Sequence, residues 1–295
     1  MERDYLLKIL DREGNFRIIL AATTMLVDEA QRRHQCSATA AAALGRVLTA
    51  TVMMGCDLKN PTDAITIKIN GNGSAGTILA TADSQGQVRG FISNNLADAP
   101  SIRPGKLDVG TVVGTQGYLE VRKDIALKQP FAGKVELVSG EIAEDLASYF
   151  LRSEQIPALV ALGVLVDTDL SIKASGGLIV QALPEADLSK VELLEKNIAD
   201  LGLISSAIDN NIDLSAVAAR ITTGLDCDIV GEMPLYFKCK CSPTKILNVL
   251  SSLEAQEFNN LPDNEPIEII CNYCAEPYYY TKTEIKKAKE TALGQ

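Results

Sequence analysis

The spacing of apolar residues along the chain predicts many short strands and a few helices. Within residues 64–70, Ile65, Ile67 and Ile69 alternate with polar residues, which is the two-residue period of a half-buried strand. Short β-rich runs separated by turn residues such as Glu13-Gly14-Asn15 are interpreted in the same way. The predicted strands are 5–10, 16–22, 64–70, 77–82, 87–93, 117–122, 131–139, 160–166 and 178–183, with Gly176-Gly177 between the last two.

Three helices are predicted within residues 1–183. Thr24 is the expected cap of a helix that reaches Gln35, and Ser37 is the expected cap of an alanine-rich helix that reaches Cys56. The alanine-rich helix is apolar on most sides, so we expect it at the centre of the core. A third helix is predicted over 141–155. Because helices and strands do not alternate regularly, the expected class is α+β, with an N-terminal mixed β-sheet core and packed helices.

Residues 71–76 match the glycine pattern GxGxxG of dinucleotide-binding loops. That motif requires a helix directly after the glycines, whereas residues 77–82 have the composition of a strand. We therefore interpret the glycines as turns of a β-hairpin and do not assign a nucleotide site to them.

The segment 184–232 changes character and predicts a helical linker region. Asp187 is the expected cap of its first helix, and a second helix is expected over 213–223. An apolar stripe along the first helix requires a cover, and the neighbouring C-terminal domain is one candidate; the alternative is an ordinary helical subdomain. The stripe consists of Leu188, Val191, Leu194, Ile198 and Leu201.

Two close pairs of cysteines dominate residues 233–295, the expected C-terminal domain. The pairs have the form Cys-x-Cys and Cys-x-x-Cys, and four thiolate sulfurs can surround a Zn²⁺ ion tetrahedrally. Ser242-Pro243 between them is a helix-start signal, and residues 267–270 are interpreted as a strand. The sequence therefore predicts a small all-cysteine zinc domain. The predicted ligands are Cys239, Cys241, Cys271 and Cys274.

The same four cysteines support two interpretations. Lys238, Lys240 and the helix start after Cys241 create a positive potential, which favours thiolate over thiol. Thiolates bind metal ions and also react with oxidants. The site is therefore either a permanent structural zinc site or a redox switch, and the spacing leaves both open.

The composition disfavours several other classes of partner. A net charge of −10, without a long basic cluster, disfavours nucleic acid and acidic membranes. The longest run of low polarity, 38–56, contains Arg46 and suits a buried helix better than a bilayer. No apolar h-region of a signal peptide is recognised near the N-terminus. With seven cysteines in the chain, these features predict a cytoplasmic protein whose thiols are free or bind metal.

No enzymatic chemistry beyond that of thiols is expected. His34, the single histidine, lies inside a helical run and has no nucleophile motif beside it. Cys36, Cys56 and Cys227 lie in apolar surroundings, so they are interpreted as small core residues.

Several short motifs, together with the cysteine pairs, resemble the bacterial redox-regulated heat shock chaperones, the 33 kDa chaperonin family. The motifs occur in the family's order, and the resemblance covers nearly the whole chain. They are Leu44-Gly45-Arg46, Val88-Arg89-Gly90, Gly140-Glu141-Ile142-Ala143-Glu144-Asp145 and Ser153-Glu154-Gln155-Ile156-Pro157.

The resemblance implies an ATP-independent holdase that binds unfolded or misfolded client proteins and is inactive while reduced and zinc-bound. Oxidation is expected to form the disulfides Cys239–Cys241 and Cys271–Cys274, to release zinc, and to unfold the C-terminal domain and the linker. The activated members of the family form homodimers. The alternative is a zinc-ribbon interaction or nucleic-acid-binding protein with a constitutive structural zinc. Ala275 departs from the Asn or Gly that is common there, and Pro243 from the usual charged residue.

Overall fold

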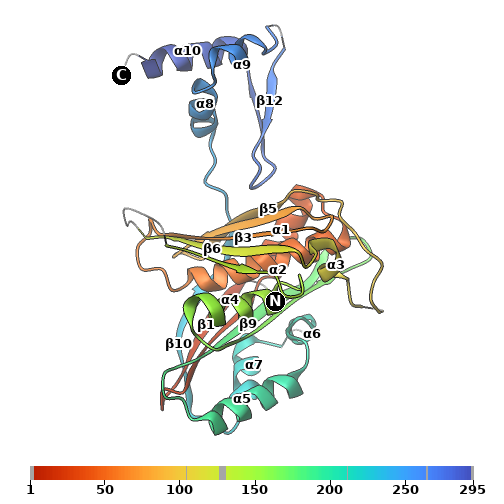
Figure 1. Ribbon diagram of the computed structural model, residues 1–295, viewed down its shortest axis with the longest axis vertical. Coiled ribbons are helices and arrows are strands. Elements are labelled where there is room, and N and C mark those ends of the chain that lie inside the picture. Colours follow the sequence, from red (N-terminus) through yellow and green to blue (C-terminus); the bar gives the residue numbers. More distant parts are fainter. Residues whose placement is uncertain (1–2, 104, 126–130, 211, 264, 294–295) are drawn as a thin grey trace. The chain divides into compact units, whose positions relative to one another are not determined.

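The chain folds into two compact units, Met1–Lys238 and Cys239–Gln295. The computed structural model describes residues 3–103, 105–125, 131–210, 212–263 and 265–293 (Figure 1). The first unit contains two β-sheets and packed helices, and the second contains a two-stranded sheet and three helices among the described residues. The expected α+β class is confirmed.

The first sheet of the larger unit has five antiparallel strands in the order β10-β1-β2-β9-β8. Strands β1 and β2 form the predicted N-terminal hairpin, since Leu6 pairs with Ala21 across it. Side chains on both faces of the sheet are buried, Leu6 in one apolar cluster and Leu7 in another. The strands are β1 (Tyr5–Asp11), β2 (Phe16–Ala22), β8 (Ala158–Val166), β9 (Ile172–Ala182) and β10 (Cys227–Pro234).

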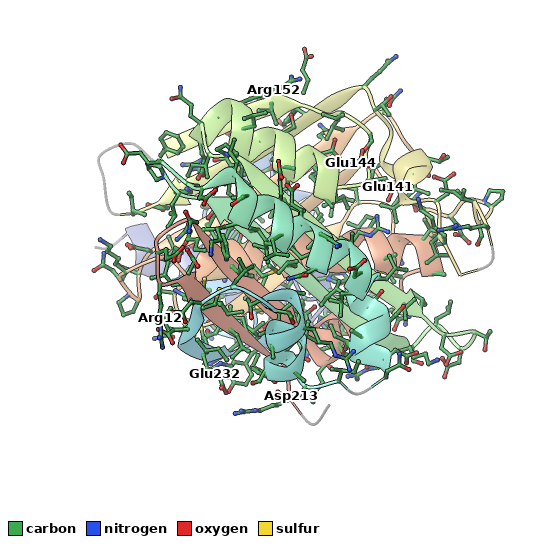
Figure 2. All side chains as sticks on the ribbon, turned by 90° about the horizontal axis from the view of Figure 1, so that it is seen from below. Arg12, Glu141, Glu144, Arg152, Asp213 and Glu232 are labelled. Carbon is green, nitrogen blue, oxygen red and sulfur yellow. The ribbon has the colours of Figure 1, made fainter. Side chains whose placement is uncertain are left out.

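Strand β10 lies at the edge of this sheet and is joined to β1 far away in sequence. Besides the main-chain ladder, the Arg12 guanidinium donates two 2.7 Å hydrogen bonds to the Asp228 carboxylate. Arg3 forms a 2.7 Å ion pair with Glu232. Figure 2 shows Arg12 and Glu232 on the outside of the unit. The linker boundary expected from the sequence near residue 232 therefore lies inside a paired strand.

The second sheet has six strands in the order β11-β5-β4-β3-β6-β7, antiparallel except for the parallel pair β11–β5. The predicted alternation along β3 is present, because Ile65, Ile67 and Ile69 are buried while the residues between them are partly exposed. The strands are β3 (Ala64–Gly71), β4 (Thr77–Asp83), β5 (Gln87–Ile92), β6 (Gly117–Asp124), β7 (Phe131–Glu136) and β11 (Tyr236–Phe237).

The glycine-rich segment 71–76 connects β3 to β4, so a strand and not a helix follows it, as predicted. A Cβ atom on Gly73 would lie 2.3 Å from the carbonyl oxygen of Val112, in helix α3 (Val109–Val113). The Gly73 N–H donates a 3.0 Å hydrogen bond to the carbonyl of Val113. Glycine is therefore required here for close backbone packing.

One predicted turn is wrong. Gly176 and Gly177 were expected between two strands, but they lie inside β9 and pair with Ala22 and Ala21 of β2. A Cβ atom on Gly176 would lie 2.2 Å from the Ile208 side chain, and one on Gly177 would lie 3.0 Å from Met53. The two glycines admit helices closely packed on opposite faces of the strand.

Helix α2 (Ala38–Gly55) lies between the two sheets and contacts strands of both (Figure 1). Every residue in it except Ala38 and Arg46 is buried, as the alanine-rich sequence predicts. Ser37 caps it, since its hydroxyl accepts the Ala40 N–H. By length and composition α2 could cross a membrane, but 89% of that stretch is buried inside the protein, as in an ordinary core helix.

Buried carboxylates fix the starts of two other helices. Helix α1 (Thr24–His34) does not use the expected Thr24 cap; the Asp4 carboxylate accepts the N–H groups of Met25 and Leu26 instead. Asp145 accepts the N–H groups of Val138 and Ile142 at the start of α4. The predicted helix over 141–155 is α4 (Ala143–Tyr149) followed by a π-helical turn, η1 (Phe150–Glu154).

Helices α5, α6 and α7 cover the face of the five-stranded sheet opposite to α2 (Figure 1). Leu194 is fully buried there and Ile198 nearly so, whereas Leu188 is 73% exposed. Leu188 is therefore not part of the packed stripe, because it lies in the first turn, before the helix reaches the sheet. The stripe is covered within the first unit. The helices are α5 (Leu188–Leu201), α6 (Ile204–Asp209) and α7 (Leu214–Ile221).

In the folded chain, residues 184–238 belong to the same compact unit as the core. The three-part division of the chain into a core domain (1–183), a helical linker region (184–232) and a zinc-binding domain (233–295) remains a prediction.

The C-terminal unit has a small apolar core. Among its described residues, Leu250, Tyr280 and Ile285 form the buried cluster, with partly buried apolar residues around them. The predicted helix start is confirmed, because Ser242 accepts the Lys245 N–H and Pro243 occupies the first turn. The elements are α8 (Pro243–Ser251), α9 (Ala255–Asn259), β12 (Ile267–Ile270), β13 (Pro277–Tyr280) and α10 (Lys282–Leu293).

Candidate metal centre

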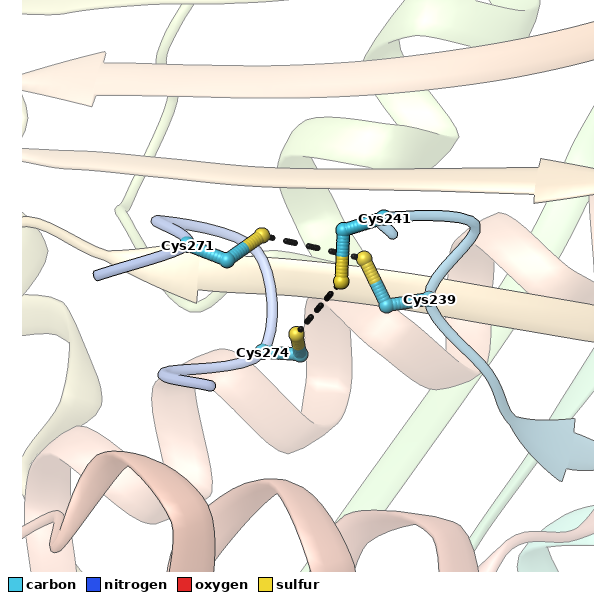
Figure 3. Close-up of side chains that lie close together, drawn as sticks. All are labelled: Cys239, Cys241, Cys271 and Cys274. Atoms are coloured by element: carbon cyan, nitrogen blue, oxygen red, sulfur yellow. Dashed lines mark hydrogen bonds between the residues drawn. The ribbon is translucent and has the colours of Figure 1, made fainter. Parts of the chain in front are cut away.

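Four cysteine sulfurs of the C-terminal unit converge, and all lie within 4.8 Å of one another (Figure 3). The Sγ atoms of Cys239 and Cys271 are 3.8 Å apart, and those of Cys241 and Cys274 are 3.4 Å apart. Each of these contacts joins a cysteine of the first pair to one of the second. The site is therefore assembled by folding, since its two halves are more than 30 residues apart in sequence.

The first pair is positioned by the start of α8. Cys241 directly precedes the cap residue Ser242, so the chain turns there from an extended segment into the helix. The ammonium group of Lys245 donates a 2.8 Å hydrogen bond to the carbonyl of Lys240, which fixes the backbone between the two cysteines. Both cysteines of this pair are partly buried.

The second pair sits in the tight turn between β12 and β13. The Cys274 and Ala275 N–H groups both donate to the Cys271 carbonyl, and the Cys271 N–H donates to the Glu276 carbonyl. Ala275 has a φ of +55°, in the left-handed region that favours Gly or Asn. The β-carbon of Ala275 in this conformation therefore places mild backbone strain beside the site.

Tyr278 is a site residue that sequence reasoning missed. Its hydroxyl donates a 3.1 Å hydrogen bond to Cys241 Sγ. Two residues on, the Tyr280 hydroxyl donates to the carbonyl of Pro243, at the start of α8. The sequence signal that could have indicated Tyr278 is the alternation of side chains along β13, which places residues 278 and 280 on the same face of the strand.

The surroundings shift the thiol pKa values in opposite directions. Burial raises the pKa of Cys239 to about 11, and burial together with the neighbouring sulfurs raises the pKa of Cys274 further. Burial also opposes ionisation of Cys241, but hydrogen bonds from Tyr278 and the other cysteines outweigh it, so its pKa is lowered. The expected shift toward thiolate is found at Cys241, whereas at Cys239 burial shifts the pKa in the opposite direction.

The donor set fits a tetrahedral thiophilic cation. Sulfurs at the corners of a zinc tetrahedron, with bonds of about 2.3 Å, lie about 3.8 Å apart, close to the two measured separations. Four packed sulfurs can all be ionised only if a cation balances their charge, and zinc binding releases the thiol protons. The cysteines could therefore hold a metal ion.

The other three cysteines lie away from this cluster. Cys36 and Cys56 are buried in the main core, and burial raises the pKa of each thiol to about 12. Cys227 is partly buried, and burial with the acidic residues Asp11, Asp226 and Asp228 raises its pKa to about 11. Their interpretation as core residues is confirmed for Cys36 and Cys56; Cys227 packs at the edge of a second cluster.

The fold and the site define an α+β protein with a small C-terminal cysteine-rich unit that can hold a metal ion. Residues 4–281 match the family model of the Hsp33 protein. The chain is 43% identical to the 33 kDa chaperonin of Desulforamulus reducens over 97% of both chains, and 41% identical to that of Clostridium botulinum over 99% of both. The crystal structure of the 33 kDa chaperonin from Thermotoga maritima superposes with a TM-score of 0.90, at 32% identity and full coverage of both chains. The protein belongs to the Hsp33 family of chaperones.

Proposed function

We propose that this protein is an ATP-independent holdase whose binding of unfolded or misfolded proteins is controlled by the oxidation state of its four clustered cysteines. The observation that carries the proposal is the convergence of Cys239, Cys241, Cys271 and Cys274 within 4.8 Å. Family membership supports the chaperone activity itself.

In the reduced state the four thiolates bind one Zn²⁺ ion. The ion supplies folding free energy to the unit, about 10–16 kcal/mol for structural zinc in small domains. The C-terminal unit depends on it, because its core contains few buried side chains. In this state the protein is inactive.

Oxidation joins Cys239 to Cys241 and Cys271 to Cys274. Each disulfide forms as two thiolates transfer two electrons to the oxidant. The sulfurs then no longer carry the charge that holds the cation, and the C-terminal unit loses its main source of stability. All four sulfurs lie within 4.8 Å of one another, so the two sulfurs of each close pair are near enough to be joined without a large movement of the backbone.

Loss of the C-terminal fold spreads to the segment 184–232. The apolar surface between α5 and the five-stranded sheet then becomes available to clients and to a second subunit, so the active form is a homodimer. Free thiols of this kind persist in a reducing compartment, which supports a cytoplasmic location. The net charge supports protein clients over nucleic acid or membrane.

Metal analysis of the reduced protein and its Cys271→Ser variant tests the site. The wild type should carry one zinc per chain, and the variant should lose most of its zinc affinity. Cys227→Ser, a half-buried thiol outside the cluster, is the matched control and should retain the metal. Undiminished zinc affinity in Cys271→Ser would exclude the four-ligand site.

Peroxide treatment distinguishes the switch from a constitutive structural zinc. The switch predicts zinc release, disulfides within each cysteine pair by peptide mapping, and a gain of anti-aggregation activity. A zinc-ribbon interaction protein would retain its zinc and show unchanged behaviour.

A further inference from the structure

A cavity of about 400 Å³ opens between the two sheets of the first unit, at the C-terminal end of α2. Its size falls within the range of about 300–1,000 Å³ typical of sites for small organic ligands. The inner wall is apolar and comes from both sheets, from α2 and from η1. The buried side chains of this wall are Ile19, Met54, Ile65, Phe150 and Ile179.

The rim of the cavity is polar, and its carboxylates are already engaged. Asp57 accepts a 2.9 Å ion pair from Arg17. Glu154 accepts a 2.5 Å hydrogen bond from Lys123 and one of 3.0 Å from the Tyr149 hydroxyl. The third carboxylate, Asp63, accepts the main-chain and side-chain N–H groups of Asn60.

In contrast, a hydrogen-bond donor at the rim, the side-chain amide of Gln181, is not fully used. Gln181 is only 3% exposed and accepts a 2.7 Å hydrogen bond from Arg17 Nε at its carbonyl oxygen. Within the described part of the chain, its side-chain NH₂ group has no acceptor, although it lines the cavity. Among the described residues, the fully enclosed polar atoms that lack a partner do not include this nitrogen, so it is accessible from the cavity and can donate to an acceptor on a ligand.

Lys59 adds a free positive charge at the same rim, because none of the described residues forms an ion pair or hydrogen bond with its ammonium group. Three cationic side chains line the cavity, and two of them are already paired, Arg17 with Asp57 and Lys123 with Glu154. Lys8, outside the lining, also contacts Asp57, at 3.4 Å. Among the described residues of the rim, the groups left without a partner are therefore donors, the Lys59 ammonium and the Gln181 amide. An anionic acceptor group is therefore the complement of this rim.

We propose that this cavity binds a small amphipathic carboxylate, such as a medium-chain fatty acid. The alkyl chain lies against the apolar wall. The carboxylate accepts hydrogen bonds from the Gln181 amide and pairs with Lys59 and Arg17. All residues that line the cavity belong to the first unit, and none is one of the four clustered cysteines. Ligand binding here can therefore be tested independently of the proposed redox switch.

Isothermal titration calorimetry on the reduced, zinc-loaded full chain tests the site, with ligands kept below their micelle concentrations. Decanoate should bind with a stoichiometry of one. Octanoate should bind about tenfold more weakly, since each buried methylene contributes about 0.8 kcal/mol. The decyltrimethylammonium cation should not bind. Absence of decanoate binding, or equal binding of the cation, would overturn the proposal.

Three variants locate the bound carboxylate. Gln181→Glu preserves the acceptor for Arg17 but faces the ligand with a like charge, and should weaken decanoate binding by about tenfold or more. Lys59→Met should weaken it less, while Lys106→Met, at an exposed lysine away from the cavity, should leave it unchanged. Leu58→Trp should block the cavity. Decanoate binding unaffected by both Gln181→Glu and Leu58→Trp would place the ligand elsewhere and contradict the assignment.

Discussion

At the residue scale, the seven cysteines divide into four that converge and three that do not. Cys36 and Cys56 are fully enclosed, and their raised pKa values keep them as thiols at neutral pH. Oxidants react with the thiolate, so burial and protonation both protect these residues. These two thiols of the first unit are therefore not expected to take part in oxidation.

This division predicts that Cys36, Cys56 and Cys227 are dispensable for activation. A variant with all three replaced by Ala should be less stable, because two of the sites are in the core, but it should gain activity on oxidation as the wild type does. Circular dichroism establishes that the variant is folded, and the aggregation assay measures activation. Loss of activation in a folded variant would reveal a redox partner outside the cluster.

Asp4 gives the first unit a pH dependence with a defined sign. Burial outweighs the N–H groups of Leu26 and Met25 and raises its pKa from 3.8 to about 6. The folded protein therefore binds this proton more tightly than the unfolded chain does. The stabilisation is complete below pH 3.8 and is lost as the pH rises through about 6, by up to about 3 kcal/mol.

Comparison with Asp4→Asn, which cannot titrate, isolates this contribution. Between pH 4 and pH 7 the free energy of unfolding of the wild type should fall relative to that of the variant, as measured by urea denaturation. A difference that does not change with pH, or that changes in the opposite direction, would show that Asp4 does not titrate as described.

At the element scale, α5 is held to the sheet by its middle and not by its start. Leu194 is fully buried against the five-stranded sheet, whereas Leu188 on the same helix is exposed. Leu194→Ala should lower the free energy of unfolding by about 2–5 kcal/mol through loss of contacts and the cavity left behind. Leu188→Ala is the matched control and should change it by less than about 0.5 kcal/mol. Equal effects in urea denaturation would contradict this packing.

Strand β3, helix α2 and the two glycines of β9 show which features of the fold could be predicted from the sequence. The isoleucine alternation of β3 and the alanine-rich run of α2 were correctly predicted, because in both cases a single periodicity sets the burial pattern. Gly176 and Gly177 were misplaced, because glycine marks a turn as often as it marks close packing, and only the tertiary neighbours Ile208 and Met53 distinguish the two.

The metal centre was also predicted where a local sequence pattern defines it and missed where a tertiary contact does. Its four cysteines could be found from spacing, because two close pairs of cysteines are typical of a metal site. Tyr278 could not, because its contact with Cys241 depends on how β13 packs beside the start of α8. The edge strand β10 was missed for a related reason: its partner β1 lies at the opposite end of the first unit's sequence, and no local pattern records such a pairing.

At the scale of the whole molecule, the two units differ in what stabilises them. The first has an extensive core around α2, whereas the second has few buried side chains and a candidate metal centre. Oxidation should therefore act first on the C-terminal unit and next on the segment 184–232, while α2 stays folded. The proposed switch therefore predicts a defined order of unfolding on oxidation.

Hydrogen exchange measured by mass spectrometry tests the ordering. Protection of residues 185–230 should be high in the reduced protein and should fall on oxidation, because α5 is then no longer held on the sheet. Peptides from α2 should stay protected and serve as the internal control. Unchanged protection over 185–230 together with a rise in chaperone activity would place the client site elsewhere.

The central claim is that oxidation of the four cysteines turns on binding of unfolded proteins, and light scattering of a denaturing test protein measures this directly. The reduced, zinc-loaded chain should leave the aggregation of the test protein unchanged. The oxidised chain should suppress it at near-stoichiometric ratios, without ATP, and added reductant should reverse the conversion before a client is bound. Equal suppression by the reduced and oxidised chains, or none by either, would contradict the account.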